Sequence, residues 1–246
     1  DTRKTGTTIK FKPDGKIFSS TIFDHKTVVT RLKESAYLIK GLKIQFDDLR
    51  NNTSELFHFE HGIVEFVKDL TATKTRIHEP TFFVGEYSGI YVEASLVYCS
   101  NTYNENVLSF VNNIRTHDGG SHEIGFRTAI TRAFNEHARM IGALKDKDPN
   151  MDGADIREGL TAVISIRIPE NLLQFESQTK NKLGTPEAKQ AVENVVYEKM
   201  RFFMAEKGEI ANTLINNALK AAKAREAARK ARDDARMVKQ KTSKPS

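Results

Sequence analysis

The sequence predicts an α+β protein in two lobes, and three observations along its 246 residues support this prediction. Some segments alternate apolar and polar side chains with the period of a strand, and others carry the apolar stripe of an amphipathic helix. Residues 50–54 have loop composition and divide these elements, so we expect the lobe boundary there. Beyond residue 217 the chain becomes rich in alanine and basic residues, which predicts a long C-terminal helix.

The first lobe, residues 1–53, is expected to contain two strands and a helix. Residues 7–12 alternate as a half-buried strand does, and a Pro-Asp-Gly sequence then turns the chain. Residues 24–40 carry a helical apolar stripe with Asp24 as the N-cap. The second strand is predicted over residues 42–46.

The second lobe, residues 54–217, is expected to hold most of the elements. Strand-like runs occupy residues 55–59, 81–84, 90–98, 106–112 and 160–168. Helices are predicted over residues 62–70, from Ser121 (as N-cap) to about Met140, and from Pro186 almost to the end of the chain. Residues 145–153 are predicted to form a loop.

The positive charge of the chain is concentrated near its C-terminus. The formal net charge is +6, but residues 218–244 contain ten basic and three acidic residues, a local charge of +7. The remaining residues therefore sum to about −1. A protein that coats nucleic acid over its whole surface would spread its basic residues more evenly. Only the C-terminal arm is a candidate for extensive contact with nucleic-acid phosphates.

Cysteine usage and hydropathy indicate a cytoplasmic protein without a membrane partner. The single cysteine, Cys99, cannot form an internal disulfide, and its apolar sequence context predicts a buried, inert thiol. No apolar run approaches the roughly 18 residues that a membrane-spanning helix needs.

No metal site is predicted within the chain. Residues 146–153 begin like a calcium-binding EF-hand loop, but Met151 and Arg157 stand where that loop needs Gly and a bidentate Glu. His58 and His61 are three residues apart, and no third ligand converges with them in the sequence.

The polar loop at residues 174–187 presents Gln178 and Lys180 just before a well-defined helix start. Thr185 suits the N-cap of that helix, and Pro186 suits its first position. A lysine on such a loop can offer an ammonium group to a phosphate. On the loop sequence alone, a solvated surface lysine is the more common alternative.

Five segments in chain order carry a resemblance to a known protein family. They lie at residues 4–11, 110–127, 155–163, 178–184 and 224–232. The fourth, which begins Gln-Thr-Lys, resembles the loop of that sequence in the transducer domain of bacterial type IIA DNA topoisomerases. The others resemble a late strand of the ATPase domain, the transducer's strand, Asp-Gly-Gly turn and helix, the start of its next strand, and the arm before the metal-binding TOPRIM domain. The chain is therefore identified as a member of the family of ATPase subunits of these enzymes, over residues 4 to about 236.

The resemblance implies three parts. Residues 1–53 correspond to the end of an ATPase sandwich of the GHKL superfamily, and residues 54–217 to a transducer domain of ribosomal-protein-like βαβ type. Residues 218–246 correspond to a basic helical arm that leads toward a TOPRIM domain. Residues 108–116 and 173–184 look more like topoisomerase IV of Gram-positive bacteria than gyrase, whose B subunit is the close alternative.

A nucleotide site is also implied, with ATP and Mg²⁺ as cofactors. Thr7 corresponds to the threonine that helps to hold the adenine; a strand threonine with a satisfied hydroxyl is the alternative. Lys180 corresponds to the transducer lysine that reaches the γ-phosphate, with Gln178 beside it, so both are predicted catalytic residues. The family's magnesium-binding Asn, water-activating Glu and ATP lid correspond to positions before residue 1. We therefore expect no ATP hydrolysis by this chain alone.

DNA is the implied macromolecular partner. Arg127 matches a basic position that faces the DNA-holding cavity in the family; an ordinary helix-surface salt bridge is the alternative. The arm is expected to contact DNA phosphates, or else to be a solvated helix that joins domains, through Lys220, Lys223, Arg225 and Arg229. The resemblance further implies a homodimer of the ATPase subunit, which joins the A subunit of topoisomerase IV in the complete enzyme.

An alternative from another class is a non-enzymatic nucleic-acid-binding protein, because the transducer fold resembles a ribosomal-protein fold. An RNA-coating surface should be basic. The near-neutral charge of residues 1–217 therefore speaks against this alternative.

Overall fold

The computed structural model describes residues 6–242, with side chains up to Met237, and divides the chain into two compact units, Asp1–Glu60 and His61–Ser246. The predicted lobe boundary at residues 50–54 is wrong. These residues form the turn of a hairpin in which β1 (Lys43–Asp48) and β2 (Thr53–His58) pair antiparallel. Because paired strands belong to one unit, the division falls after the hairpin.

In the first unit, helix α1 (His25–Leu38) is fastened to the hairpin by polar contacts. The predicted N-cap is confirmed, since the Asp24 carboxylate accepts the Thr27 amide at 2.7 Å. His25 lies 3.0 Å from the Asp48 carboxylate through Nδ1 and 3.2 Å from that of Glu55 through Nε2. One imidazole therefore joins the start of α1 to both strands.

The strand predicted over residues 7–12 is not formed. Residues 6–14 have no regular secondary structure, and Thr7 is exposed within them. An alternating segment becomes a strand only when its backbone groups pair with a neighbouring strand. Among residues 6–242, no strand pairs with this segment.

The second unit is built around a five-stranded sheet in the order β3-β4-β7-β5-β6. The strands are β3 (Thr81–Tyr87), β4 (Ile90–Tyr98), β5 (Asn106–Val111), β6 (Ile114–Arg115) and β7 (Leu160–Arg167). All neighbouring pairs are antiparallel except β5 and β7, which are parallel and are connected through helix α3 (Ser121–Met140). This connection is a βαβ arrangement.

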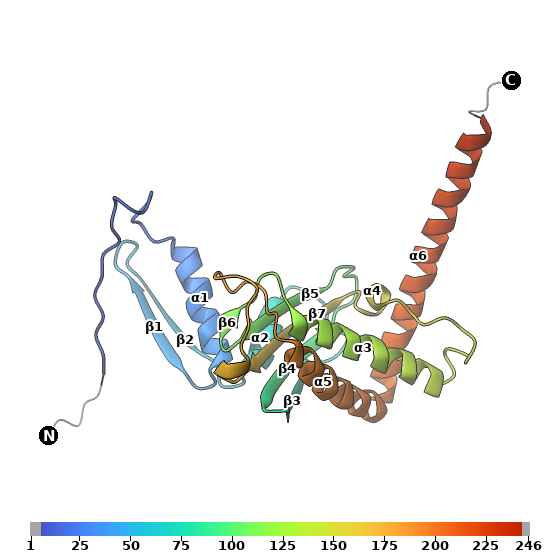
Figure 1. The fold of residues 1–246 in the computed structure, drawn as a ribbon, viewed down its shortest axis with the longest axis horizontal. Coiled ribbons are helices and arrows are strands. Elements are labelled where there is room, and N and C mark those ends of the chain that lie inside the picture. The colour runs from blue at the N-terminus through green and yellow to red at the C-terminus, as the bar shows by residue number, and fades with distance from the viewer. Residues whose placement is uncertain (1–5, 243–246) are drawn as a thin grey trace. The chain divides into compact units, whose positions relative to one another are not determined.

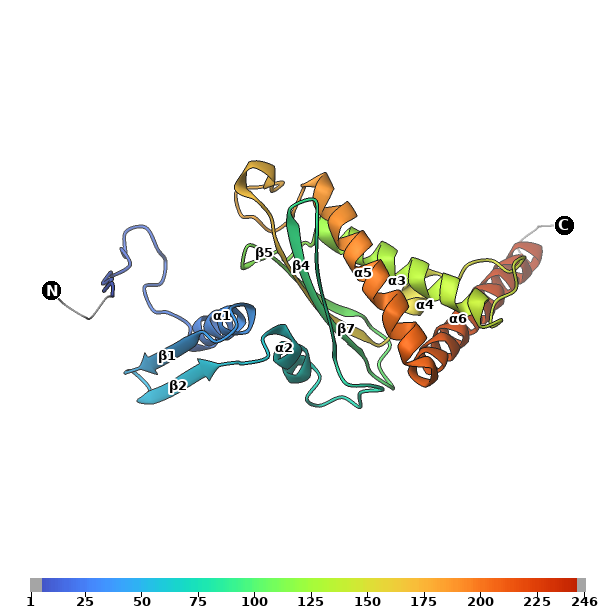
Figure 2. The same ribbon diagram turned by 90° about the horizontal axis from the view of Figure 1, so that it is seen from below.

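Helices cover both faces of this sheet, as Figure 2 shows. Helices α3 and α5 (Pro186–Glu206) pack side by side on one face, and α2 (Ile63–Leu70) lies on the other. The central strands β4 and β7 are therefore almost completely buried. Cys99 is buried at the end of β4, where desolvation raises the pKa of its thiol, as expected for an inert cysteine.

Helix α3 begins differently from its prediction. Ser121 is the first residue of the helix and not its N-cap, which is Gly120. The Ser121 hydroxyl is buried and has no hydrogen-bond partner among the described residues. Three further elements were not predicted: β6, the short helix α4 (Gly153–Ile156) and the 3-10 turn η1 (Glu170–Leu172). Elements of two to four residues carry too little periodicity to be recognised in a sequence.

The C-terminal helix α6 (Gly208–Thr242) runs without interruption through the predicted boundary at residue 217, and Figure 1 shows its far end projecting away from the sheet. All side chains of residues 223–237 are exposed. The helix is nevertheless tied to α4 by Arg225, whose Nε and Nη2 lie 3.0 and 2.9 Å from the two carboxylate oxygens of Asp155. No helix within residues 6–242 has both the length and the apolar character that crossing a bilayer requires.

Removing the Arg225 guanidinium should loosen this attachment. Arg225→Ala leaves the buried Asp155 carboxylate without its bidentate partner. We expect the melting temperature of the 246-residue chain to fall by roughly 3–8 °C, because a kilocalorie corresponds to a few degrees in a chain of this size. The matched control is Lys223→Ala, an exposed basic residue two positions earlier. Equal melting temperatures for the two variants would show that the Arg225–Asp155 pair contributes nothing.

Candidate functional site

The polar loop predicted before α5 is an ordered hairpin, residues 174–184. Gly184 N donates to Gln174 O at 2.8 Å, and Glu176 N donates to Lys182 O at 3.0 Å. The turn is closed by Lys180 N, which donates to Ser177 O at 3.0 Å. Gln178 and Lys180 are therefore brought together at the tip, as the sequence predicts for neighbouring residues of one loop.

Lys180 adopts a backbone conformation that its residue type disfavours. Its φ is +57°, in the left-handed region. The other described non-glycine residues with positive φ are one Ser and four Asn, and Asn tolerates this region better than Lys. A lysine here costs on the order of 1 kcal/mol relative to glycine. Local backbone preference therefore does not explain why a lysine occupies the tip.

The root of the hairpin is held by the Asp-Gly-Gly turn before α3. Asp118 N donates to Asn181 O at 2.9 Å, and Leu183 N donates to Gly119 O at 3.0 Å. Ser121 N in turn donates to Leu183 O at 3.0 Å. Two segments about sixty positions apart in the sequence thus form one backbone-bonded structure.

Gly120 is required where these segments meet. Its φ is +138°, and a Cβ at this position would lie 2.4 Å from Leu183 O. A side chain would therefore force the hairpin away from the turn. The Leu183 side chain is 1% exposed and belongs to the hydrophobic core of the second unit. The hairpin root is consequently anchored in the core as well as on the turn.

Thr185 also serves the hairpin and does not form the predicted cap bond. It stands at the N-cap position of α5, with Pro186 at the helix start as predicted, but its side chain makes no capping hydrogen bond. The hydroxyl instead donates to Leu172 O at 2.9 Å and accepts from Gln174 N at 3.0 Å. A hydroxyl has one donor and two acceptor sites, and here the donor and one acceptor site are used by the loop backbone.

A buried polar network packs against the Asp-Gly-Gly turn. The Ser109 hydroxyl donates to the Glu123 carboxylate at 2.7 Å and lies 2.6 Å from the Thr116 hydroxyl, which in turn lies 3.1 Å from His122 Nε2. Burial lowers the pKa of His122 to about 3, so this imidazole is neutral at pH 7. A Cβ on Gly119 would meet the Glu123 carboxylate at 2.8 Å. Turn and helix start are therefore closely packed.

Arg127 continues this network along α3. Its Nη2 lies 2.9 Å from Glu105 and 3.2 Å from Glu123, and Arg157 contacts the same Glu105 from the other side at 2.5 Å. The salt-bridge alternative predicted for Arg127 is thus present in the structure. The Arg127 side chain is still 37% exposed. It borders a shallow groove of about 540 Å³ whose lining also includes Arg132, Arg139 and Arg157.

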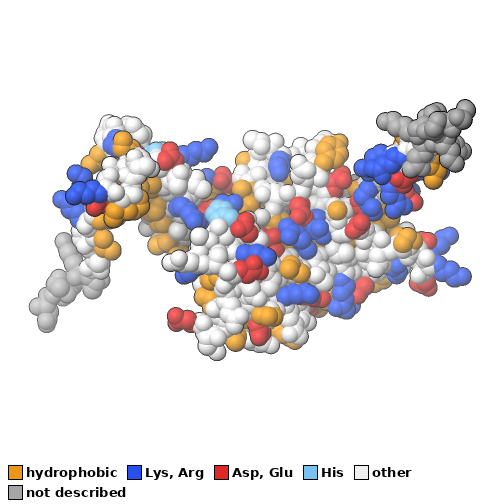
Figure 3. Space-filling view, turned by 45° about the horizontal axis from the view of Figure 1, so that its top comes forward, with side chains coloured by type: hydrophobic (Ala, Val, Ile, Leu, Met, Phe, Trp, Pro, Cys, Tyr) orange, Lys and Arg blue, Asp and Glu red, His pale blue; other side chains and the backbone are white. Residues whose placement is uncertain are grey.

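The basic residues predicted on the arm have different environments. Lys220, Lys223 and Arg229 are exposed on α6, and Figure 3 shows Lys and Arg side chains gathered toward the C-terminal end of this helix. Arg225 is instead engaged by Asp155, which raises the pKa of its guanidinium. Thr7 belongs to the first compact unit. Within residues 6–237 no cluster of His, Cys, Asp or Glu could hold a metal ion.

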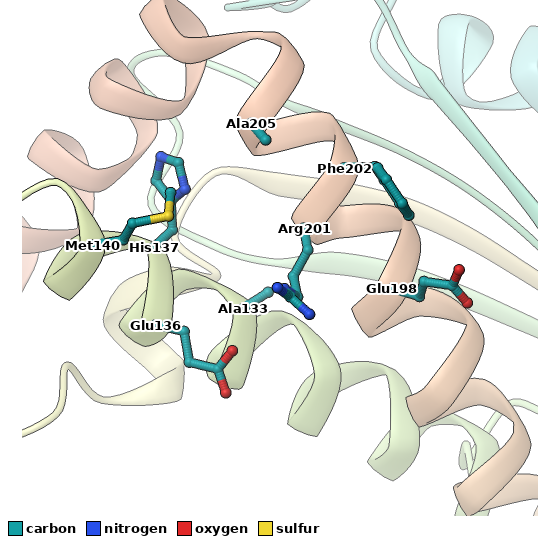
Figure 4. A pocket seen from close by; sticks show the side chains of 8 residues that line it. All are labelled: Ala133, Glu136, His137, Met140, Glu198, Arg201, Phe202 and Ala205. Carbon is teal, nitrogen blue, oxygen red and sulfur yellow. The ribbon is translucent and has the colours of Figure 1, made fainter.

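A second cavity, of about 270 Å³, lies between α3 and α5. Figure 4 shows Arg201 extending from α5 toward Ala133 and Glu136 of α3. His137 also lines it, and burial lowers the pKa of that imidazole. The sequence did not predict this cavity, because its residues belong to the ordinary faces of two packed helices.

Comparison with known proteins agrees with this architecture. The family model for DNA gyrase B matches residues 62–234. The B subunit of DNA topoisomerase 4 from Staphylococcus epidermidis is 54% identical over 230 residues, which are 92% of this chain and 34% of that protein. The Bacillus subtilis protein of the same name is 52% identical over 240 residues, 98% of this chain and 36% of that protein.

Among solved structures, the 43K ATPase domain of Thermus thermophilus gyrase B, crystallised with an aminocoumarin, superposes with a TM-score of 0.77 at 39% identity. The match covers 91% of this chain and 60% of that one. The protein thus has a mixed α+β fold like that of the gyrase B ATPase region. It belongs to the DNA gyrase B family, as the sequence resemblance predicts. The chain spans about a third of the length of the curated relatives it matches.

Substitution of Gly120 should separate the hairpin from the turn. We expect Gly120→Ala to lower the free energy of unfolding by at least about 2 kcal/mol, because backbone strain and the collision with Leu183 O combine. Gly142→Ala is the control, since φ there is also positive but no atom lies within 4 Å of the added Cβ. It should cost only about 1 kcal/mol. Urea unfolding measures both; equal losses would mean that the close approach to Leu183 is unimportant.

Proposed function

We propose that this chain is the part of a type IIA DNA topoisomerase ATPase subunit that communicates the state of the bound nucleotide to DNA. Residues 1–60 would then contribute the end of a GHKL ATPase domain, residues 61–217 a transducer domain of βαβ type, and the rest of α6 a connection toward a TOPRIM domain. The observation that carries this proposal is Lys180, a lysine held in a left-handed conformation at the tip of an anchored hairpin.

In this proposal Lys180 places its ammonium group against the γ-phosphate of ATP, with Gln178 beside it. During phosphoryl transfer, negative charge builds up on the terminal phosphate and its leaving oxygen. A pre-positioned ammonium stabilises that charge without reorganising at the moment of reaction. A Mg²⁺ ion would accompany the phosphates of the nucleotide.

The same contact would report on the nucleotide. It exists only while the γ-phosphate is present, so hydrolysis and phosphate release remove it. The hairpin root is hydrogen-bonded to the turn that starts α3. A displacement of the tip would therefore be transmitted to α3 and, through its packing, to α5. Loss of one charge contact would in this way change the position of two long helices.

DNA is the proposed macromolecular ligand. The groove bordered by Arg127, Arg132, Arg139 and Arg157 and the exposed basic side chains of α6 offer positive charge to phosphates. Arg225 is given a structural role, because its guanidinium is paired with Asp155. Thr7 would help to hold the adenine. We further propose a cytoplasmic homodimer that joins the A subunit of the same enzyme.

Topoisomerase IV is the preferred enzyme and gyrase the alternative. The two relatives at 54% and 52% identity are named as B subunits of topoisomerase 4, whereas the structural neighbour at 39% is a gyrase B. Decatenation of linked DNA circles by the full-length protein, reconstituted with its partner, would support topoisomerase IV. ATP-dependent introduction of negative supercoils would instead identify gyrase.

Removing the Lys180 ammonium should abolish most ATP turnover. In the full-length protein we expect Lys180→Ala to lower kcat roughly 100-fold, as for loss of one charge-stabilising donor. Lys180→Gly should be equally inactive but more stable than the alanine protein, since glycine relieves the left-handed strain. The control is Lys182→Ala, which removes a neighbouring lysine that is ion-paired with Glu176 at 3.1 Å. Full turnover by either Lys180 variant would contradict the proposal.

The arm should contribute a salt-dependent part of DNA binding. For the full-length protein, Lys223→Ala combined with Arg229→Ala should flatten the slope of log affinity against log salt by about 2, because each phosphate contact contributes about 0.9. Asn212→Ala combined with Asn216→Ala, on the same helix, is the uncharged control. Fluorescence anisotropy over a salt series measures the slope. An unchanged slope would favour a solvated connecting helix.

A further inference from the structure

Thr185 is a completely buried residue whose hydroxyl joins the two sides of the 174–184 hairpin root. The side chain is 0% exposed. Its Oγ1 donates to Leu172 O at 2.9 Å, just before the hairpin begins, and accepts from Gln174 N at 3.0 Å, the first residue of the hairpin. Thr185 itself directly follows Gly184, the last residue of the hairpin. One hydroxyl therefore connects the segment that enters the hairpin to the segment that leaves it.

We propose that Thr185 is a positioning residue for Lys180, one that fixes the direction in which the hairpin tip points. The proposal rests on the proposed function of Lys180. The backbone of Gln174 is held by two hydrogen bonds. Its N–H donates to the Thr185 hydroxyl, and its C=O accepts from the Gly184 amide at 2.8 Å. Loss of the hydroxyl would release one of these two restraints and allow the hairpin to pivot at its root.

The helix that follows Thr185 is closely packed. Helix α5 starts at the next residue and crosses α3 so closely that a Cβ on Gly125 would lie 2.2 Å from Lys189 O. Repacking of α5 against α3 would therefore not compensate for a pivot of the hairpin relative to α5. The six residues from Lys180 to Thr185 would carry this movement to the tip, where an ångström of misplacement is enough to impair a catalytic contact.

The usual role of a threonine before a helix is filled by other features. The Thr185 side chain makes no capping hydrogen bond to α5, and Pro186 sets the first helical position. Removal of the hydroxyl should therefore leave the start of α5 intact. A functional loss in a Thr185 variant would then report on the hairpin and not on the helix.

The test uses the full-length ATPase subunit in complex with its partner and DNA. We expect Thr185→Val, which keeps the shape and removes the hydroxyl, to lower kcat for ATP hydrolysis about tenfold with KM changed less than about twofold. Thr185→Ser restores the hydroxyl and should be within about twofold of the parent. In a Lys180→Ala background, Thr185→Val should have almost no further effect, because residues that act as a unit are non-additive.

Two controls make the result decisive. Thr213→Val removes a hydroxyl that donates to Glu209 O on the exposed face of α6, and it should leave kcat unchanged. Thr185→Cys retains a weak hydrogen-bonding group, so its kcat should lie between those of the serine and valine proteins. The cysteine protein therefore provides the test if the valine protein does not accumulate. Parent-like activity of the valine and cysteine proteins would overturn the proposal.

The double variant Lys180→Ala/Thr185→Val distinguishes a positioning role of Thr185 from a purely structural one. If Thr185→Val lowered the turnover of the Lys180→Ala protein by the same factor as that of the parent, Thr185 would act independently of Lys180 and the inference would be wrong. If Lys180→Ala itself hydrolysed ATP normally, the proposed function would fail instead. A large effect of Lys180→Ala with none of Thr185→Val would remove only the positioning role.

Discussion

Leu183 is held by backbone hydrogen bonds to Gly119 and Ser121 on one side and lies opposite Phe175 on the other, with its side chain in the core. The candidate site depends on this arrangement. It joins the hairpin root to the start of α3, and only a glycine at position 120 leaves room for this close approach. Without it, the 174–184 segment would be the solvated polar loop that its composition indicates.

The same arrangement would allow the proposed contact between Lys180 and a γ-phosphate to displace helix α3. Lys180 lies at the tip of a short hairpin whose root is bonded to the Asp-Gly-Gly turn, and that turn packs on the buried polar network around Glu123. Glu123 also contacts Arg127, which shares Glu105 with Arg157 near α4. Packed and paired elements of this kind shift as units. Polar contacts thus extend from the hairpin toward α4, the short helix whose Asp155 binds Arg225 of α6.

The sequence predicted the elements that carry strong local periodicity. Helices α1, α3 and α5 and strands β3, β4, β5 and β7 lie within a few residues of their expected positions, because amphipathic spacing is a local property. Partners were less predictable. Ser121 and Thr185 were both expected to cap helices, yet neither hydroxyl does so, since tertiary neighbours determine where a hydroxyl bonds. Arg225 is predicted to contact DNA phosphates, and its ion pair with Asp155, seventy positions away, could not be predicted from local sequence. The segment 7–12 alternates like a strand but finds no partner strand in residues 6–242.

The nucleotide-sensing role is predicted for Gln178 and Lys180 only from the family resemblance, because loop lysines are common and composition does not distinguish them. Hydrogen exchange at the hairpin tip is the most direct test of a γ-phosphate-sensing role for Lys180. Exchange would be measured on the full-length protein in its assembled enzyme, once with a non-hydrolysable ATP analogue bound and once with ADP bound. Exchange over residues 177–182 should slow with the analogue and stay unchanged with ADP. Equal protection by both nucleotides, or no protection while the analogue is bound, would contradict that role.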